Sequence, residues 1–189
     1  QEMEVYTILY NGPGAGASIP QHAHFQMLEK GHLPIEAFME GVNTTPMITS
    51  GKASLAKVNW MYPFYILTST NYNDAIEAFE QLFKTLTSKQ KQMNNLIGWY
   101  ENGKWYIAII LRKAHRPDYY YKTGKEQIIV SPASVEMGGI IVTIREEDFK
   151  KLNSNKIESI MQQVTTSVYP HTVSVGVIEN KVIRFNLSG

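Results

Sequence analysis

The stretch that decides the fold is NLIGWYENGKWYIAIILRK, Asn95 to Lys113. Two runs rich in β-branched and aromatic residues flank Asn102-Gly103, the residue pair that the type I′ turn of a two-residue β-hairpin prefers. The stretch therefore predicts two adjacent antiparallel strands.

Strand and helix patterns follow each other irregularly on both sides of this hairpin. Strands are predicted at 4–10, within 53–67 with an interruption at Pro63, and at 172–178. Apolar residues at helical spacing, or flanking turn signals, predict helices at 34–40, 73–88, 145–152 and 155–165. There is no regular βαβ alternation, so the predicted fold class is α+β with a mainly antiparallel sheet.

Composition restricts the kinds of partner. The chain has 189 residues, enough for one compact domain, and 18 basic against 17 acidic side chains. A nearly neutral protein has no general attraction to nucleic acid or to an acidic membrane, so neither is expected as a partner. With no cysteine there can be no disulfide or thiolate metal site, and no apolar run is long enough to span a membrane. A cytoplasmic location is expected.

A glycine-rich segment runs into two histidines and a glutamine in NGPGAGASIPQHAHFQ, Asn11 to Gln26. Glycine and proline predict a loop over 11–20, and alternation predicts a strand over 21–28. Period two would place three polar side chains on one face, His22, His24 and Gln26. The opposite face, with Ala23, Phe25 and Met27, is expected to pack against the protein.

Three interpretations of this face are open. It could simply be solvent-exposed. Alternatively, the glycine loop could cradle a phosphate with its backbone N–H groups, helped by Ser18, while an imidazole attacks phosphorus to form a phosphohistidine intermediate. A metal site ranks third, because the strand spacing supplies no i, i+4 chelating pair; no metal and no cofactor are expected.

In order, Asn11, Gly16-Ala17-Ser18, His22, His24 and Gln26 resemble the motif of the histidine-triad superfamily, in the branch with glutamine at the third triad position. This branch contains galactose-1-phosphate uridylyltransferase, diadenosine tetraphosphate phosphorylase and the GDP-hexose phosphorylases. The later segments LRKAHRPDYY and SPASVEMGG resemble phosphorylase-like members, particularly a group from Bacteroidetes. The resemblance implies a histidine-triad-like fold and a nucleotide or nucleotide-sugar substrate.

The resemblance also implies roles for individual residues. His24 would be the nucleophile, the backbone carbonyl of His22 would hold its ring N–H, and Gln26 and Ser18 would bind phosphoryl oxygens. Histidine at the position of Gln26 accompanies hydrolases in this superfamily, so glutamine implies transfer to phosphate or to a sugar phosphate. Asn11, Gly16 and Ala17 would complete the phosphate site.

A basic segment after the hairpin supplies further candidates for binding phosphate. Arginine forks match phosphate oxygens, so Arg112, Lys113, His115 and Arg116 are predicted to contact substrate. The competing interpretation is a basic, solvated loop that begins where the strand ends.

Two domain boundaries are proposed from the sequence. Residues 1–170 are interpreted as a nucleotidyltransferase or phosphorylase-type domain that lacks its N-terminal part. Residues 171–189 are interpreted as a tail, whose segment VSVGVIENKVIRFNLSG resembles the opening strand pair of SpoIID/LytB-type domains and could begin a second domain. The alternative function is an inactive nucleotide- or sugar-phosphate-binding module of a larger protein. The oligomeric state is open, with a homodimer as one candidate.

Overall fold

The computed structural model describes residues 5–166, 177–178 and 181–182. One antiparallel sheet of seven strands has the order β2-β1-β6-β7-β5-β4-β3. Its strands are β1 (Tyr6–Asn11), β2 (Phe25–Glu29), β3 (Ile48–Ser50), β4 (Ala53–Asn59), β5 (Pro63–Ser69), β6 (Asn94–Glu101) and β7 (Lys104–Leu111). A separate two-stranded sheet pairs β8 (Val177–Ile178) with β9 (Lys181–Val182).

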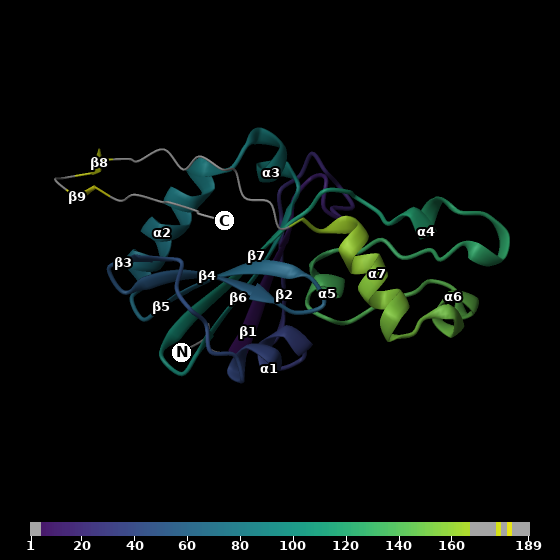
Figure 1. Cartoon of the computed structure of the whole chain (residues 1–189), viewed down its shortest axis with the longest axis horizontal. Helices are drawn as coiled ribbons and strands as arrows, with labels where there is room; N and C mark the ends of the chain where they lie inside the picture. The colour runs from purple at the N-terminus through teal and green to yellow at the C-terminus, as the bar shows by residue number, and fades with distance from the viewer. Residues whose placement is uncertain (1–4, 167–176, 179–180, 183–189) are drawn as a thin grey trace.

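Helices flank the large sheet, and three of them, α4, α6 and α7, gather beside it on the right of Figure 1. The helices are α1 (Pro34–Glu40), α2 (Tyr72–Thr85), α3 (Ser88–Gln92), α4 (Asp118–Tyr121), α5 (Ser134–Met137), α6 (Glu146–Lys151) and α7 (Ser154–Val164), with a 3₁₀ turn η2 (Gly124–Glu126). The predicted α+β class with a mainly antiparallel sheet and flanking helices is confirmed. Among the residues described, no helix is both long enough and apolar enough to cross a bilayer.

The central hairpin forms as predicted. Strands β6 and β7 pair from Asn94 with Leu111 to Glu101 with Lys104. Asn102 and Gly103 both have positive φ, 50° and 76°, as a type I′ turn requires. The hairpin lies in the middle of the sheet, so its two faces are buried in two different cores.

Period two divides the apolar side chains between these cores. On one face, Leu9, Ile97 and Ile110 pack with side chains of α1, α5 and α7. On the other, Leu67 and Ile109 pack against α2. Helix α2 lies over β4 and β5, so it leaves the β1–β2 end of its face uncovered.

The predicted strand over 21–28 is partly wrong. Strand β2 begins only at Phe25, after a turn in which the His22 N–H donates to the Ile19 carbonyl at 3.1 Å. The expected packing of the apolar face is also wrong, because Phe25 and Met27 are 69% and 66% exposed. The reason is position: β2 is the edge strand, beyond the reach of α2.

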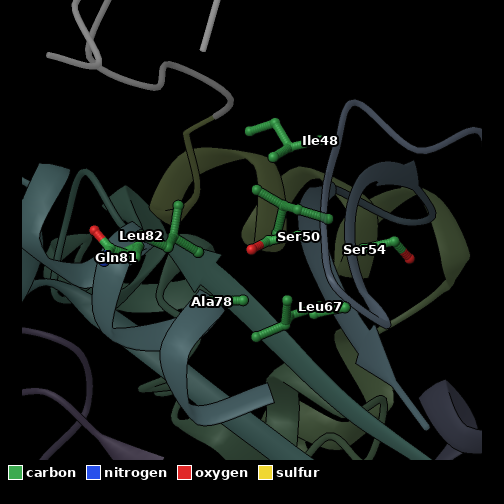
Figure 2. Close-up of a pocket in the computed structure, with 9 residues that line it drawn as sticks. Ile48, Ser50, Ser54, Leu67, Ala78, Gln81 and Leu82 are labelled. Carbon is green, nitrogen blue, oxygen red and sulfur yellow. The ribbon is translucent and has the colours of Figure 1, made fainter. Parts of the chain in front are cut away.

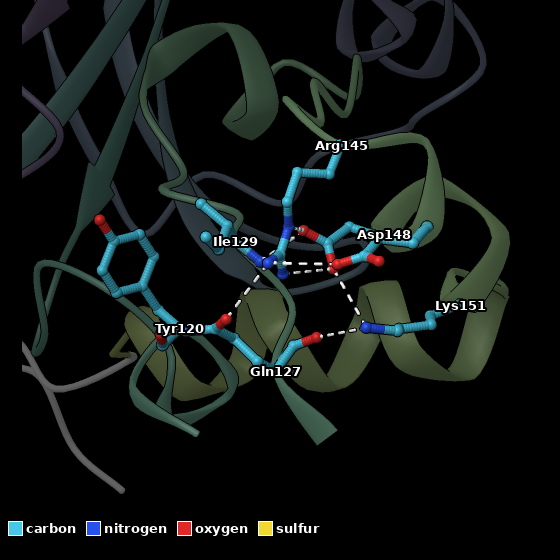
Figure 3. A network of polar contacts seen from close by, with 7 residues as sticks. Tyr120, Gln127, Ile129, Arg145, Asp148 and Lys151 are labelled. Carbon is cyan, nitrogen blue, oxygen red and sulfur yellow. Dashed lines mark hydrogen bonds and ion pairs between the residues drawn. The ribbon is translucent and has the colours of Figure 1, made fainter. Parts of the chain in front are cut away.

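Helix α6 is anchored by a buried carboxylate. Asp148 accepts hydrogen bonds from Arg145 Nε at 2.7 Å, from the Ile129 N–H at 3.0 Å and from Lys151 Nζ at 3.3 Å (Figure 3). The Arg145 side chain is the main reason why the pKa of Asp148 is lowered to about 2. Lys151 also donates to the Gln127 carbonyl at 2.8 Å, so the network ties α6 to the segment after η2.

The predicted tail domain, 171–189, lies almost wholly outside the described residues. Only the strand pair β8–β9 within it is described.

Candidate functional site

The glycine-rich loop connects β1 to β2 and lies against the start of β6. The Gly12 N–H donates to the Asn94 carbonyl and the Gly14 N–H to the Gln92 carbonyl, both at 2.9 Å. Gly16 has a φ of +90°, and a Cβ there would lie 2.8 Å from the Cα of Ala133. Both the backbone conformation and the close approach therefore require glycine at position 16.

His24 is held by the backbone of His22. Its Nδ1 lies 2.9 Å from the His22 carbonyl oxygen, and the two rings stack with centroids 6.0 Å apart. A carbonyl can only accept, so Nδ1 carries the proton, and in the neutral ring Nε2 keeps a free lone pair. This is the arrangement that a nucleophilic imidazole needs.

Gln26 follows at the start of β2, where it pairs with Leu9, and its side chain is exposed. His24 is half-buried and the His22 side chain is exposed. Because β2 begins at Phe25, the three polar residues do not all lie on one strand as predicted; the histidines belong to the loop that leads into it.

Asn11, at the end of β1, is oriented by its neighbours. Its Oδ1 accepts hydrogen bonds from Asn95 Nδ2 and from the Ser134 N–H, both at 2.7 Å. Its Nδ2 has no protein acceptor within the described residues, so the amide N–H groups are available to a ligand.

Arg112 has a different role from the one predicted. Only 2% of the residue is exposed, so it cannot contact a phosphate directly, and the expectation of such a contact is wrong. All five of its N–H groups donate to protein oxygens; the acceptors are Asn95 Oδ1 and the carbonyls of Ala114, His115, Pro132 and Val164. Burial lowers the pKa of Arg112 to about 10, and the side chain is still charged at neutral pH.

His115 contacts the glycine loop, whereas the other basic candidates do not. The Gly16 N–H donates to His115 Nδ1 at 3.4 Å, a long hydrogen bond. Burial lowers the pKa of His115, and the nearby Arg116 and Arg112 lower it further against the opposing effect of Gly14, so the ring is neutral at pH 7. The Arg116 guanidinium stacks on Tyr120, with its Cζ atom 4.2 Å from the centroid of the ring, and Lys113 is exposed.

Fewer backbone N–H groups of the glycine loop are available to bind a phosphate than predicted. The N–H groups of Gly14, Ala15 and Gly16 all donate within the protein. In the described part of the chain, the N–H groups of Ala17 and Ser18 have no protein acceptor, and the Ser18 side chain is exposed. An anion could therefore meet two backbone donors here. Nowhere in the described ranges do three or more His, Asp or Glu side chains cluster as metal ligands would.

Two residues of this region were missed from the sequence, Asn95 and Ser134. Both are fully buried and both hydrogen-bond to Asn11. The adjacent polar pair Asn94-Asn95 at the start of an apolar strand was the one signal available. Ser134 lies in the segment SPASVEMGG, which resembles phosphorylase-like members, but its contact with Asn11 joins positions 123 residues apart and could not be predicted from the sequence.

A separate apolar pocket lies between α2 and the β3–β5 end of the sheet (Figure 2). It encloses about 30 Å³, and its lining includes Ile48, Leu67, Ala78 and Leu82. None of the residues predicted to bind substrate lines it.

The fold is an α+β domain in which a glycine-rich loop and two histidines lead into an edge strand of the sheet. The chain belongs to the family described as GDPGP1-like, because the model of that family's C-terminal domain matches residues 38–172. A second model, named "Domain of unknown function (DUF4922)", matches residues 1–29, the part that contains the glycine loop and both histidines. The family supports a relationship to GDP-hexose phosphorylases and a nucleotidyl or phosphorylase-type function.

No curated protein matches the chain. Among solved structures, a DUF4931 family protein from Bacillus cereus ATCC 10987 is similar, with 17% sequence identity and a TM-score of 0.41. The match covers 82% of this chain and 68% of that one.

Proposed function

We propose that the protein is a phosphorylase-type nucleotidyltransferase that acts on a GDP-hexose through a covalent nucleotidyl-histidine at His24. The observation that carries the proposal is the 2.9 Å contact between His24 Nδ1 and the His22 carbonyl, which leaves Nε2 free to attack. Membership of the GDPGP1-like family supports the choice of a guanosine diphosphate sugar.

The reaction has two displacements. In the first, Nε2 of His24 attacks the α-phosphorus; an N–P bond forms, the bond from that phosphorus to the bridging oxygen breaks, and hexose 1-phosphate leaves. In the second, an oxygen of inorganic phosphate attacks the same phosphorus, the N–P bond breaks, and GDP leaves with His24 restored. The His22 carbonyl stabilises the positive charge of the nucleotidylated ring, because it accepts its remaining N–H.

Uncharged donors around the loop would stabilise the phosphoryl oxygens. These are the amide groups of Asn11 and Gln26 and the backbone N–H groups of Ala17 and Ser18. Such donors are most effective where charge develops in the transition state, and each typically contributes about 10²–10³ in rate.

The test uses the full chain with GDP-glucose labelled in the α-phosphate. We expect a labelled protein adduct that is stable in base and labile in acid, as a phosphoramidate is, and release of glucose 1-phosphate that depends on inorganic phosphate. His24→Asn should abolish the adduct. His22→Asn should keep it, because the interaction that positions His24 uses the backbone of residue 22.

An adduct that persists in His24→Asn would exclude His24 as the nucleophile. A wild-type protein that binds GDP but forms no adduct with any of a panel of nucleoside diphosphate sugars and dinucleoside polyphosphates would instead favour the inactive binding module.

A further inference from the structure

A chain of polar contacts runs from the buried Arg112 to the half-buried Asn11. Arg112 Nη1 donates to Asn95 Oδ1 at 2.7 Å. Asn95 Nδ2 donates at 2.7 Å both to Asn11 Oδ1 and to the Ala15 carbonyl in the glycine loop. The buried amide of Asn95 therefore connects the guanidinium both to the Asn11 side chain and to the glycine loop.

Arg112, the Ala15 carbonyl and the Ser134 N–H all favour the same direction for the hydrogen bonds in this chain. A guanidinium only donates, so the oxygen of the Asn95 amide must face Arg112 and the nitrogen must face Asn11. Asn11 must then offer its oxygen to Asn95, and the Ser134 N–H favours the same orientation at 2.7 Å. The NH₂ group of Asn11 is left as the outward donor.

We infer that Arg112 and Asn95 are positioning residues that hold the Asn11 NH₂ group as a hydrogen-bond donor for the substrate phosphate. The inference rests on the proposed function, because it assigns Asn11 to the phosphate. Asn95 also holds the Ala15 carbonyl, so the same amide fixes the backbone of the loop that contains Ala17 and Ser18.

The electrostatics of Arg112 support a role beyond packing. No ion pair involves Arg112 among the described residues, and all its acceptors are uncharged oxygens. Glu136 supplies a favourable field but no hydrogen bond to it. A buried cation without a directly paired anion is costly, and an apolar side chain often fills such a place as well. Fixing the polarity of Asn95 is something that an apolar side chain could not do.

The decisive variant is Asn95→Asp. A carboxylate has nearly the same shape as the amide and still accepts from Arg112, but it can donate neither to Asn11 nor to the Ala15 carbonyl. The carboxylate then favours turning the Asn11 amide over so that its NH₂ donates to residue 95, in competition with the Ser134 N–H, which favours the present orientation. We expect the affinity for GDP to fall by about tenfold to a hundredfold, the usual effect of losing one hydrogen bond to a charged group.

A direct readout of orientation is the side-chain ¹⁵N–¹H signal of Asn11. In the free wild-type protein it should shift on addition of GDP; in Asn95→Asp it should already be shifted without ligand and should respond little to GDP. Asn73→Asp, on the exposed first turn of α2, adds the same charge far from the loop and should behave like the wild type. An Asn11 signal unchanged by Asn95→Asp would overturn the inference.

A double-mutant cycle separates positioning from simple charge repulsion. If Asn95 acts through Asn11, Asn95→Asp should weaken GDP binding more in the wild-type background than in Asn11→Ala, where only its effect through the Ala15 carbonyl remains. Equal effects in both backgrounds would refute the inference, because residue 95 would then act on the anion or on the fold independently. The Asn11 signal and GDP binding require no turnover, so a protein that forms no adduct would refute the proposed function while leaving this result intact.

Discussion

Replacing Gly16 by alanine tests how the glycine loop is held. Gly16 and Gly31 share a φ of +90°, but their surroundings differ. A Cβ on Gly16 would lie 2.8 Å from Ala133 Cα, Ala133 Cβ and the Pro132 carbonyl oxygen, whereas a Cβ on Gly31 would meet nothing within 4 Å. Gly31→Ala is therefore a matched control that changes the backbone preference without the steric contact.

The expected losses of stability follow from these two contributions. Placing an L-residue in a left-handed conformation costs about 1–2 kcal/mol. Alanine also lowers the conformational entropy of the unfolded chain, which offsets about 0.4–1 kcal/mol of this cost. Gly31→Ala should therefore lower the free energy of unfolding by about 1 kcal/mol. Crowding against Ala133 adds about 1–3 kcal/mol, so Gly16→Ala should lose about 2–4 kcal/mol in total.

Urea unfolding followed by tryptophan fluorescence measures both variants, and comparable m-values would show that the unfolded states are comparable. Gly16→Ala should also weaken GDP binding, because the loop must move away from residues 132–133, while Gly31→Ala should not. Equal losses of stability in the two variants would refute the close packing of the loop against Ala133. If Gly16→Ala binds GDP with normal affinity, the glycine loop does not contribute to the GDP-binding site.

Three further predictions concern single side chains. Arg145, helped by the Ile129 N–H and by Lys151, lowers the pKa of Asp148 from 3.8 to about 2, so the stabilisation from the ionised carboxylate is present above about pH 4 and is lost as the pH falls towards 2. The difference in unfolding free energy between wild type and Asp148→Asn should therefore shrink from pH 7 to pH 2.5; a constant difference would contradict the ion-pair explanation. The Ser134 hydroxyl is buried without a protein partner in the described structure, so Ser134→Ala should raise the free energy of unfolding by about 1 kcal/mol in thermal or urea denaturation, and a decrease would reveal a partner. Gln26→His should divert the nucleotidyl intermediate from phosphate to water, measured as the ratio of GMP to GDP formed; the same ratio in both proteins would mean that position 26 does not select the acceptor.

Local patterns in the sequence were sufficient for the central hairpin and for the long amphipathic helices. Asn102-Gly103 adopts positive φ cheaply, so the hairpin β6–β7 could be recognised from the turn and its flanking runs alone. Helices α2 and α7 follow from apolar residues at helical spacing, which any amphipathic helix on a core must show. The predicted class, α+β with an antiparallel sheet, rests on these short-range signals.

Part of the site geometry also follows from neighbouring residues. The contact between His24 and the His22 carbonyl joins residues two apart, so the motif itself was enough to suggest it. The start of β2 and the exposure of Phe25 were not predictable in this way. Alternation says which side chains share a face, but only the position of the strand at the sheet edge decides whether that face is covered.

The role of Arg112 was decided by tertiary structure alone. In the sequence, Arg112 begins a basic segment typical of a phosphate site or a solvated loop. In the fold, acceptors from Asn95, Pro132 and Val164, up to 52 residues away in the chain, surround it and use its donors. Whether a charge can be buried depends on the oxygens that the folded chain brings to it. The local sequence does not indicate which distant residues supply these oxygens.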